Sequence, residues 1–407
     1  MRSHLLSMEE LRKDLFKADV FDRLKYVMLA AGLILLFLFG KVKKKVLIIG
    51  LGSLILVDLW MLDKTYLNNE TNPGTSSRSD NRYVAYNKPS KILDPYTASS
   101  VDQAILNQEL ALYPEITQEI QSQVQLAKKE NPRLSPGKIQ SIQFTSLMRG
   151  THYRVLNTMA KLDEDAQTAY FHKTLGGYHG AKMKKYQELV DFELGIEHYQ
   201  LRQAFQQGGR AMVEQYLPQM NVVNMLNAKY VMGAEATANG NAMVYLENPY
   251  RLGNAWFVKN LKPVNSADEE IQGFKDLDPA ATALIRTTQL GDIKTQYNPN
   301  PSDFIRLDSY LPNELVYSYQ VSADQFAVFS EIFYAGGWQA YINDQEVSHQ
   351  RVNYILRGMS IPSGSGKIVF RFKPKLVQVG NVLAMVSSVL FLVLIGGFAF
   401  QSFKKDS

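Results

Sequence analysis

Three apolar runs stand out in a chain that is otherwise mixed in polarity. They cover residues 26–40, residues 46–62 with one acid, Asp58, and residues 379–400. A membrane-spanning helix needs about 17–25 apolar residues, so the third run suffices alone and predicts a transmembrane helix over residues 376–400. The first two runs are shorter and flank a lysine-rich link. They predict a transmembrane helical hairpin over residues 26–62 with its turn at residues 41–45.

A signal peptide and a buried soluble hairpin are the other interpretations of the first run. The preceding 25 residues are mixed in charge, and Gly40 followed by Lys41 is not a small-residue cleavage site. This pattern disfavours a signal peptide. A soluble hairpin would tolerate the lysines, but it would leave the third run unexplained.

The pattern between the second and third runs changes once. Residues 101–130 have helical spacing broken at Pro114, residues 153–156 predict a short buried strand, and a helix is predicted from about Ala181 to Phe192. Residues 63–240 are therefore predicted to be mostly helical. From Met243 the period approaches two, with turn residues about every 10 positions, which predicts an antiparallel β-sandwich over residues 241–375. The predicted strands cover residues 243–246, 255–258, 303–307, 314–321, 327–333, 339–342, 352–357 and 367–372.

The charge distribution predicts the topology. The chain of 407 residues has 44 Lys and Arg against 39 Asp and Glu, and the excess lies in the lysine-rich link and at Lys404 and Lys405. Because cytoplasmic loops are rich in lysine, the link and the tail of residues 401–407 are expected in the cytoplasm. Residues 1–25 and 63–375 are then extracytoplasmic. Basic residues confined beside apolar runs also argue against a nucleic-acid partner.

These elements define the predicted fold class. It is a multi-pass α+β membrane protein with three transmembrane helices and an extracytoplasmic mixed domain that ends in the sandwich. The chain has no cysteine. This excludes disulfides, thiolate zinc sites and a cysteine nucleophile, and it fits a bacterial outer-face domain.

No standard catalytic motif occurs in the sequence. His152, His172 and His179 lack the spaced partners of a metal site, and ordinary polar contacts are the favoured interpretation. No catalytic residue and no metal ligand are assigned, and no cofactor is expected in this chain.

One segment has the chemistry of an anion site. Tyr178 and His179 follow two glycines and precede a predicted helix whose first turns carry Lys182, Lys184 and Lys185. Free N–H groups, the helix dipole and lysine ammonium groups favour a phosphate there. Near a membrane, a lipid phosphate or diphosphate headgroup is the expected ligand. The alternative is a helix start with a solvated basic face.

Two single residues are further candidates. Asp58 lies inside the second apolar run, where an acid is a functional candidate by default. An interfacial acid beside the membrane anchor Trp60 is the alternative. Trp338 could stack on a sugar ring, although such a tryptophan more often fills a sandwich core or covers its edge.

The chain resembles the C-terminal half of the bacterial YfhO-like membrane protein family. Residues 176–188 and 334–357 are the most specific parts of the resemblance, and Ala335-Gly336-Gly337-Trp338 departs from the family's commoner Pro-Gly-Trp. Further segments carry it in order: the lysine-rich hairpin, Val57-Asp58-Leu59-Trp60, Tyr153-Arg154-Val155-Leu156-Asn157, residues 170–185, Leu226-Asn227-Ala228-Lys229-Tyr230, Asn248-Pro249, Gly253-Asn254-Ala255-Trp256-Phe257-Val258, and residues 329–372.

The resemblance implies a relative of the GT-C glycosyltransferases. Those enzymes transfer sugars from polyprenyl-phosphate carriers at the outer face of the bacterial cytoplasmic membrane. Their catalytic carboxylate, and acids that can hold a divalent metal, lie in a first outer loop that would fall upstream of Met1. The chain is therefore expected to be a C-terminal part that acts with a missing half or another membrane subunit. Its other implied partners are membrane lipids and a polyprenyl-phosphate-linked sugar.

Two other classes of function remain open. A non-catalytic, membrane-anchored envelope binding or scaffold protein would use the sandwich as its working module. A sensor or permease subunit is disfavoured because a tail of seven residues leaves no room for a signalling domain.

Overall fold

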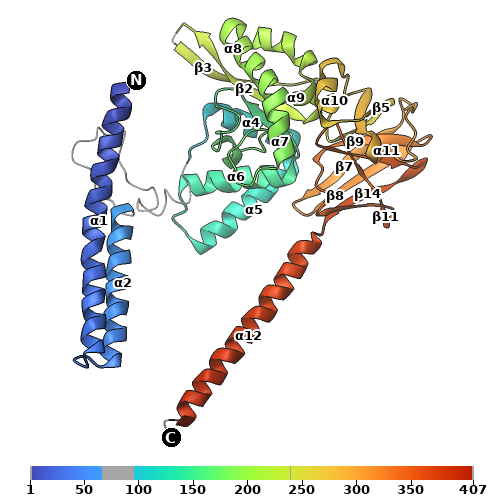
Figure 1. Cartoon of the computed structure of the whole chain (residues 1–407). Coiled ribbons are helices and arrows are strands. Elements are labelled where there is room, and N and C mark those ends of the chain that lie inside the picture. The colour runs from blue at the N-terminus through green and yellow to red at the C-terminus, as the bar shows by residue number, and fades with distance from the viewer. Residues whose placement is uncertain (1, 67–95, 239, 406–407) are drawn as a thin grey trace. The chain divides into compact units, whose positions relative to one another are not determined.

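The computed structural model describes residues 2–66, 96–238 and 240–405, and the chain divides into two compact units, residues 1–95 and 96–407. The first unit is a helical hairpin of α1 (Arg2–Leu38) and α2 (Lys44–Tyr66) (Figure 1). Residues 67–95 of the predicted helical region and the last two residues of the predicted tail lie outside the described part. α1 begins at Arg2 rather than near residue 26 because residues 2–25 are rich in good helix formers.

The hairpin turn is closed by a glycine. Gly40 has a φ of +70°, its N–H donates to the carbonyl of Phe37 at 2.9 Å, and the Lys41 N–H donates to the carbonyl of Leu36 at 2.9 Å. These two bonds form a Schellman motif, which satisfies the last carbonyls of α1. A Cβ at Gly50 would lie 2.5 Å from the Leu33 side chain, so this glycine lets the two helices approach closely.

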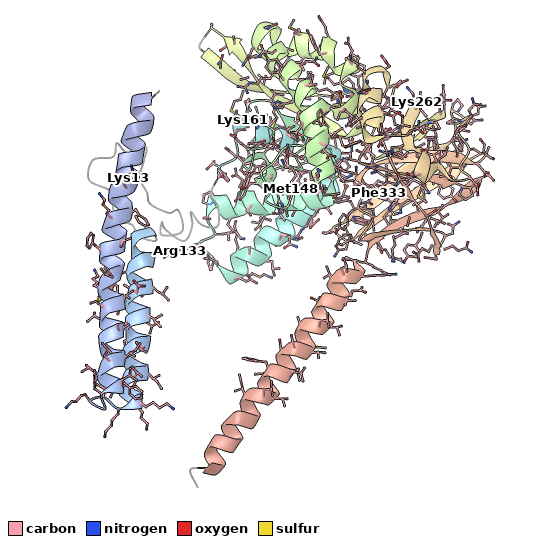
Figure 2. The ribbon with its side chains drawn as sticks, viewed as in Figure 1. Lys13, Arg133, Met148, Lys161, Lys262 and Phe333 are labelled. Atoms are coloured by element: carbon pink, nitrogen blue, oxygen red, sulfur yellow. The ribbon has the colours of Figure 1, made fainter. Side chains whose placement is uncertain are left out.

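One helix of the described residues is long and apolar enough to cross a membrane. It is α12 (Lys375–Lys405), whose segment Lys375–Gly397 has 23 residues, a mean hydropathy of 2.3 and no buried positions. Side chains project from this helix along its length (Figure 2). The apolar helical stretch Leu24–Leu38 is shorter than a span. The third predicted span is thus supported by length and composition, while three spans and a multi-pass topology stay predictions.

The second unit begins with three helices packed on a small sheet. Ser99 caps α4 in a reciprocal capping box with Asp102, and Ser135 caps α6. Ile105 and Phe144 of the helices pack against Tyr230 of the sheet. The helices are α4 (Ser100–Leu112), α5 (Pro114–Glu130) and α6 (Pro136–Gly150), and the sheet is β1 (Arg154–Asn157), β2 (Ala228–Thr237) and β3 (Gly240–Glu247), in which β1 and β2 are parallel.

A second layer covers the other face of this sheet. The helix that begins at Lys184 runs from α7 (Lys184–Leu189) through the π-helical turn Val190–Leu194 into α8 (Gly195–Tyr216). Leu201 and Phe205 of α8 pack with Leu156 and Val231 of the sheet. Side chains of neighbouring residues in a strand point to opposite faces of the sheet. The three-stranded sheet therefore contributes to one hydrophobic core on each of its faces.

The rest of the second unit is a β-sandwich before α12. Tyr317 and Phe370 of one sheet contact Phe329 of the other, with ring centroids 5.0 and 4.9 Å apart. All neighbouring strands are antiparallel except β5 and β6. The first sheet has the order β11 (Gln345–Val347), β10 (Trp338–Ile342), β14 (Gly364–Phe372), β8 (Glu314–Val321) and β7 (Phe304–Leu311); the second has β4 (Ala255–Val258), β9 (Gln325–Ile332), β13 (Leu356–Ile361), β12 (Gln350–Val352), β6 (Thr282–Arg286) and β5 (Asn260–Val264).

The fold confirms the mixed α+β class and corrects two predicted elements. The predicted strand at residues 352–357 is two strands, because Asn353 and Tyr354 adopt left-handed φ values of +46° and +67° and reverse the chain. The predicted strand at residues 243–246 is β3, which pairs with β2 in the three-stranded sheet and not within the sandwich.

Candidate functional site

The predicted anion segment, residues 176–185, leads into α7 and includes its first two residues. The helix begins at Lys184 and not at Ala181, so Lys182 precedes it, and Met183 at its N-terminus provides no side-chain cap. Gly176 is required by close packing, because a Cβ there would lie 2.7 Å from the carbonyl oxygen of Leu162. With only six residues before the π-helical turn, α7 does not itself form an anion-binding helix start.

The three lysines of this segment make three different contacts. Lys182 Nζ lies 2.6 Å from Asp163, Lys184 Nζ lies 3.7 Å from Glu188, and Lys185 Nζ lies 4.8 Å from the centre of the Tyr354 ring. Burial is the main cause that lowers the pKa of Lys185, and the positive charge of the nearby Arg351 lowers it further. The lysines therefore do not converge on one point.

Three of the five predicted residues do line one pocket. Tyr178, His179 and Lys182 share a pocket of about 280 Å³ with Arg154 and Tyr186. Tyr178 is exposed, and the His179 ring accepts a hydrogen bond from the Ala181 N–H at 3.0 Å. Lys184 and Lys185 are not among the residues that line it. A phosphate ligand for this segment stays a prediction.

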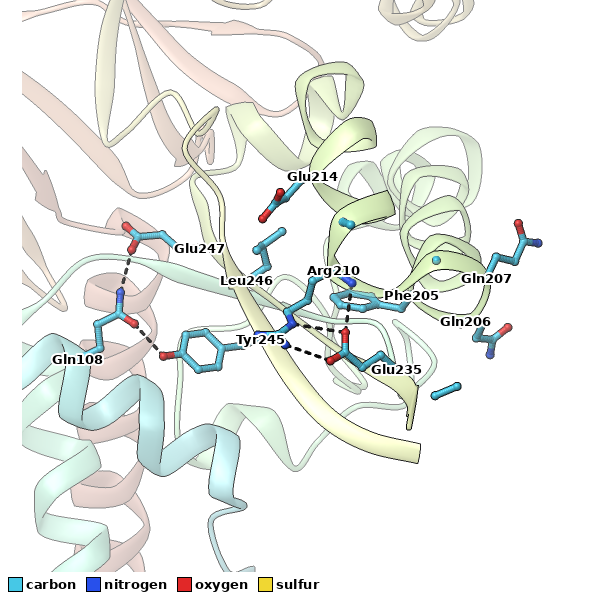
Figure 3. Close-up of a pocket in the computed structure, with 14 residues that line it drawn as sticks. Gln108, Phe205, Gln206, Gln207, Arg210, Glu214, Glu235, Tyr245, Leu246 and Glu247 are labelled. Carbon is cyan, nitrogen blue, oxygen red and sulfur yellow. Dashed lines mark hydrogen bonds and ion pairs between the residues drawn. The ribbon is translucent and has the colours of Figure 1, made fainter. Parts of the chain in front are cut away.

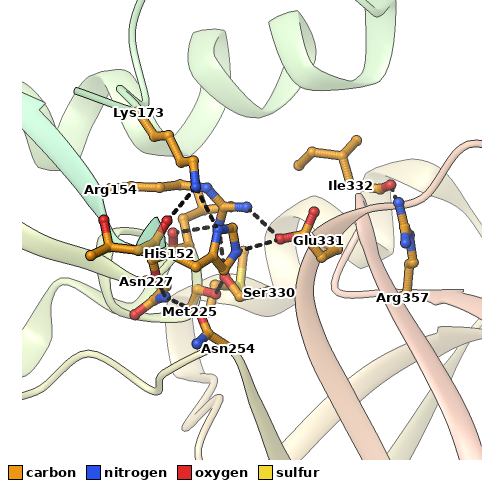
Figure 4. Close-up of polar contacts among 12 residues, drawn as sticks. His152, Arg154, Lys173, Met225, Asn227, Asn254, Ser330, Glu331, Ile332 and Arg357 are labelled. Atoms are coloured by element: carbon orange, nitrogen blue, oxygen red, sulfur yellow. Dashed lines mark hydrogen bonds and ion pairs between the residues drawn. The ribbon is translucent and has the colours of Figure 1, made fainter. Parts of the chain in front are cut away.

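A buried ionic network lies at the junction of the three-stranded sheet and the sandwich (Figure 4). Glu331 on β9 accepts hydrogen bonds from Arg154 at 3.0 Å and from His152 at 2.7 Å. On the other side of its ring, His152 lies 3.4 Å from Lys173 Nζ, which donates to the carbonyl of Thr151 at 2.6 Å. Ser330 and Leu226 also hold the Arg154 guanidinium in place, at 2.9 and 2.8 Å.

Burial and the charges of this network shift the pKa values of Glu331, His152 and Lys173. Burial would raise the pKa of Glu331, but Arg154 and His152 outweigh it and lower the pKa to about 2. Burial lowers the pKa of His152 to about 4 against the opposing effect of Glu331. Burial and the charge of Arg154 lower the pKa of Lys173 to about 7. At neutral pH His152 is therefore neutral, with Nε2–H donating to Glu331 and Nδ1 free to accept from Lys173.

A polar cavity of about 390 Å³ opens beside this network. Glu109 on α4 forms its floor with Lys229 of β2, whose Nζ lies 2.5 Å from Glu109 Oε1. The Tyr230 hydroxyl donates to the same oxygen, while Glu109 Oε2 is buried with no hydrogen-bond partner among the described residues. The lining further includes three tyrosines and several polar side chains: Tyr113, Tyr153, Tyr310, Glu115, Asp308, Arg251, Thr151, Ser309, Asn227 and Asn254.

The chemistry of this cavity suits a neutral, hydroxyl-rich ligand. Glu109, Glu115 and Asp308 outnumber the cations Lys229 and Arg251, which disfavours an anion. Glu109 Oε2 is itself enclosed, so ligand hydroxyl groups would donate instead to the exposed carboxylates of Glu115 and Asp308 in the lining. The tyrosine walls provide apolar faces next to these polar groups, as in small-molecule sites.

A wider pocket of about 800 Å³ lies between α8 and the β2–β3 hairpin (Figure 3). Arg210 lies at its edge, where Gly209, with a φ of +62°, kinks α8. Three of the charged groups around it have partners, since Arg210 Nη2 lies 3.2 Å from Glu235 and the amide of Gln108 donates to Glu247 at 2.8 Å. The charged groups of this pocket are therefore better paired than those of the cavity at Glu109.

The two single candidates lie in different units. Asp58 is partly exposed on α2 of the first unit. Trp338 begins β10 and is half-buried, with the Arg357 guanidinium 4.2 Å from its ring centre and Phe372 at 5.2 Å. Since the Arg357 guanidinium already lies on the indole, Trp338 covers the edge of the sandwich. Stacking of a sugar ring on Trp338 stays a prediction.

The remaining predicted chemistry concerns the histidines. His172 is buried and links Tyr153, whose hydroxyl lies 3.1 Å away, to Asp102 at 3.2 Å. His152 belongs to the ionic network, and His179 to the pocket of Lys182. Within the described ranges, no three His, Asp or Glu side chains are placed to hold a metal ion together.

The buried charges at Glu109, Lys229 and Glu331 were not predicted from the sequence. A signal was present, because Glu331 lies in the predicted strand of residues 327–333 and Lys229 directly precedes the apolar residues 230–232. Charged residues are almost never fully buried unless they are paired. Such positions therefore indicate buried partners, although the sequence does not say which.

One of the comparisons with known proteins matches part of the chain. Residues 290–384 match the model of a family described as bacterial membrane protein YfhO. The matched region includes the strands from β7 to β14 and enters α12, so the C-terminal part of the chain is similar to a family of bacterial membrane proteins. The resemblance indicated by the sequence is confirmed for this part. No curated protein and no solved structure gives a significant match.

Proposed function

We propose that this chain is the membrane-anchored part of a YfhO-like, GT-C-related system that handles polyprenyl-phosphate-linked sugars at the outer face of the bacterial cytoplasmic membrane. In this proposal its own domain binds the carbohydrate, and the transfer step belongs to a partner or to a further part of the protein. The C-terminus is cytoplasmic, and the mixed domain lies outside.

The cavity at Glu109 is the single observation that carries this proposal. The buried Glu109–Lys229 pair lines it together with the exposed carboxylates of Glu115 and Asp308, and its walls include Tyr113 and Tyr310. Sugar hydroxyl groups can donate to the carboxylates of Glu115 and Asp308 and accept from the Lys229 ammonium group, while the C–H faces of the sugar ring pack on the tyrosine rings. The match to a bacterial membrane protein family that continues into α12 supports the membrane setting.

The test is complementation in the bacterium that encodes the chain. We expect deletion of the gene to reduce the sugar content of an envelope polymer and the intact gene to restore it. Tyr113→Ala, which removes a wall of the cavity, should restore it poorly. Tyr250→Ala, an exposed tyrosine that does not line the cavity, should restore it fully.

The scaffold alternative gives a different result. If the protein acts only as an anchored scaffold, both tyrosine variants should restore the sugar content of the polymer equally. Equal restoration, with both proteins present in membranes at the normal level, would contradict the proposed binding role.

A further inference from the structure

The sandwich and α12 are joined by a very short connection. β14 ends at Phe372 and α12 begins at Lys375, with two residues between them. Three Cα steps reach at most about 11 Å. If α12 enters a bilayer at its first residues, the end of β14 must lie at the depth of the lipid headgroups or directly above it.

This end of the sandwich carries an aromatic cluster. The ring of Phe372 lies 5.2 Å from that of Trp338 and 6.3 Å from that of Tyr334. Gly337 is needed beneath this cluster, because a Cβ there would overlap the Phe372 ring. The Lys373 N–H donates to the carbonyl of Gly337 at 2.7 Å and fixes the cluster to the residues that lead into α12.

The turn between β7 and β8 lies at the same end. The Phe372 N–H donates to the carbonyl of Asn313 at 2.9 Å, which brings this turn beside the end of β14. Leu311 is 54% exposed and Tyr334 is 44% exposed, although both are large and at least partly apolar. Lys373 and Lys375, which follow Phe372 in the chain, are exposed.

We propose that this membrane-facing rim, formed by Leu311, Tyr334, Trp338, Phe372 and Lys373, is embedded in the headgroup layer of the bilayer that α12 enters. Tyrosine and tryptophan are enriched at membrane interfaces, since their rings are apolar and their polar groups reach water. Lysine ammonium groups beside them attract anionic headgroups. The rim then holds the sandwich at a fixed depth, which a two-residue link alone would not do.

The absence of cysteine from the sequence makes a direct test possible, since each introduced cysteine is unique. The full-length protein is reconstituted in vesicles of phosphatidylcholine with phosphatidylglycerol. Nitroxide labels are attached to Leu311→Cys, Tyr334→Cys and, as the matched control, Phe304→Cys. Phe304 is an exposed aromatic residue at the opposite end of β7, about 23 Å from Leu311 at 3.3 Å per residue.

Collisional accessibility separates lipid from water. We expect the ratio of oxygen accessibility to that of a water-soluble nickel chelate to be several-fold higher at Leu311→Cys and Tyr334→Cys than at Phe304→Cys. Equal ratios at all three positions would overturn the proposal.

A second variant distinguishes embedding from tethering by α12. A label at Asn313→Cys is measured with Leu311 and Tyr334 intact and with both replaced by serine. Both side chains are exposed, so these replacements leave the sandwich core intact. We expect the lipid exposure of the Asn313 label to be lost in the serine background. Retained exposure would mean that α12 alone positions the sandwich, and the rim would have no role.

Discussion

The carboxylate of Glu331 lies 3.0 Å from the guanidinium of Arg154, although the two residues are 177 positions apart in the sequence. Arg154 belongs to β1 of the three-stranded sheet and Glu331 to β9 of the sandwich. Both side chains are largely buried, with 13% and 11% of their surfaces exposed. This ion pair therefore joins the two parts of the mixed domain next to the candidate cavity.

Glu331→Gln should destabilise the second unit strongly. The substitution leaves Arg154 with no counter-charge and weakens the hydrogen bond from His152. Breaking a buried pair by removing one partner costs about 3–5 kcal/mol. The free energy of unfolding, measured by denaturant titration of the full-length protein in detergent, should fall by this amount.

The matched control is Glu164→Gln. Glu164 pairs with Lys161 at 2.9 Å, but the two side chains are 65% and 73% exposed. Exposed pairs contribute about 0–1 kcal/mol. An equal loss of stability in both variants would contradict the role of the buried network.

His152 should make the domain sensitive to mild acid. Its pKa of about 4 lies below the ordinary value of 6.5. Between these values the unfolded chain binds a proton that the folded protein does not, so the free energy of unfolding falls as the pH falls. Glu331, with a pKa of about 2 against an ordinary 4.5, extends this loss to lower pH.

A variant isolates the contribution of His152. Glu197, whose pKa burial raises to about 8, acts in the opposite sense between pH 4.5 and 8, so the wild-type curve alone is a mixture. From pH 6.5 to 4, wild type should lose on the order of 1–3 kcal/mol more than His152→Gln. Parallel stability curves for the two proteins would show that His152 does not titrate in this way.

The two glycines before Trp338 should tolerate alanine very differently. At Gly337 a Cβ would overlap the Phe372 ring, whereas at Gly336 it would lie 3.3 Å from the exposed ring of Tyr334. Overpacking costs about 1–3 kcal/mol. We expect Gly337→Ala to lower the melting temperature clearly and Gly336→Ala to change it little; the reverse order would contradict the packing described at the end of β14.

Charge reversal separates the predicted anion residues. Lys182 lines the pocket of Arg154 and His179, while the Lys184 side chain is 89% exposed and does not line it. If the pocket binds a phosphate group, Lys182→Glu should weaken the binding of a polyprenyl monophosphate in nanodiscs at least about tenfold, equivalent to 1.4 kcal/mol. Lys184→Glu should change it little. Unchanged binding in both variants would remove the phosphate assignment from this segment.

The sandwich was partly predictable because its strands have a clear period of two. The bounds predicted for β4 and β8 agree with the structure, since a continuous apolar run marks β4 and alternating apolar residues mark β8. The β12–β13 turn was missed because Asn353 and Tyr354 form it without glycine or proline. Asn353 is stabilised there by tertiary contacts, since its side-chain oxygen accepts from the Leu284 N–H at 2.8 Å.

The candidate site was less predictable than the fold. The cavity brings together residues from α4, β2 and β7, and no local pattern relates Glu109 to Lys229 across 120 positions. The predicted basic segment has the right composition for an anion, but the structure pairs Lys182 with Asp163 and Lys184 with Glu188. Sequence periodicity identifies which face of an element is buried, whereas pairing of distant charges depends on the assembled fold.

Direct saccharide binding tests the central claim most directly. Full-length protein in nanodiscs is examined by saturation-transfer difference NMR with a panel of neutral hexose and N-acetylhexosamine disaccharides, and with inorganic phosphate as competitor. We predict a saturation-transfer signal from at least one disaccharide that is lost in Tyr113→Ala, retained in Tyr250→Ala and unaffected by phosphate. No signal from any saccharide, or a signal that survives in Tyr113→Ala, would contradict carbohydrate binding in the cavity at Glu109.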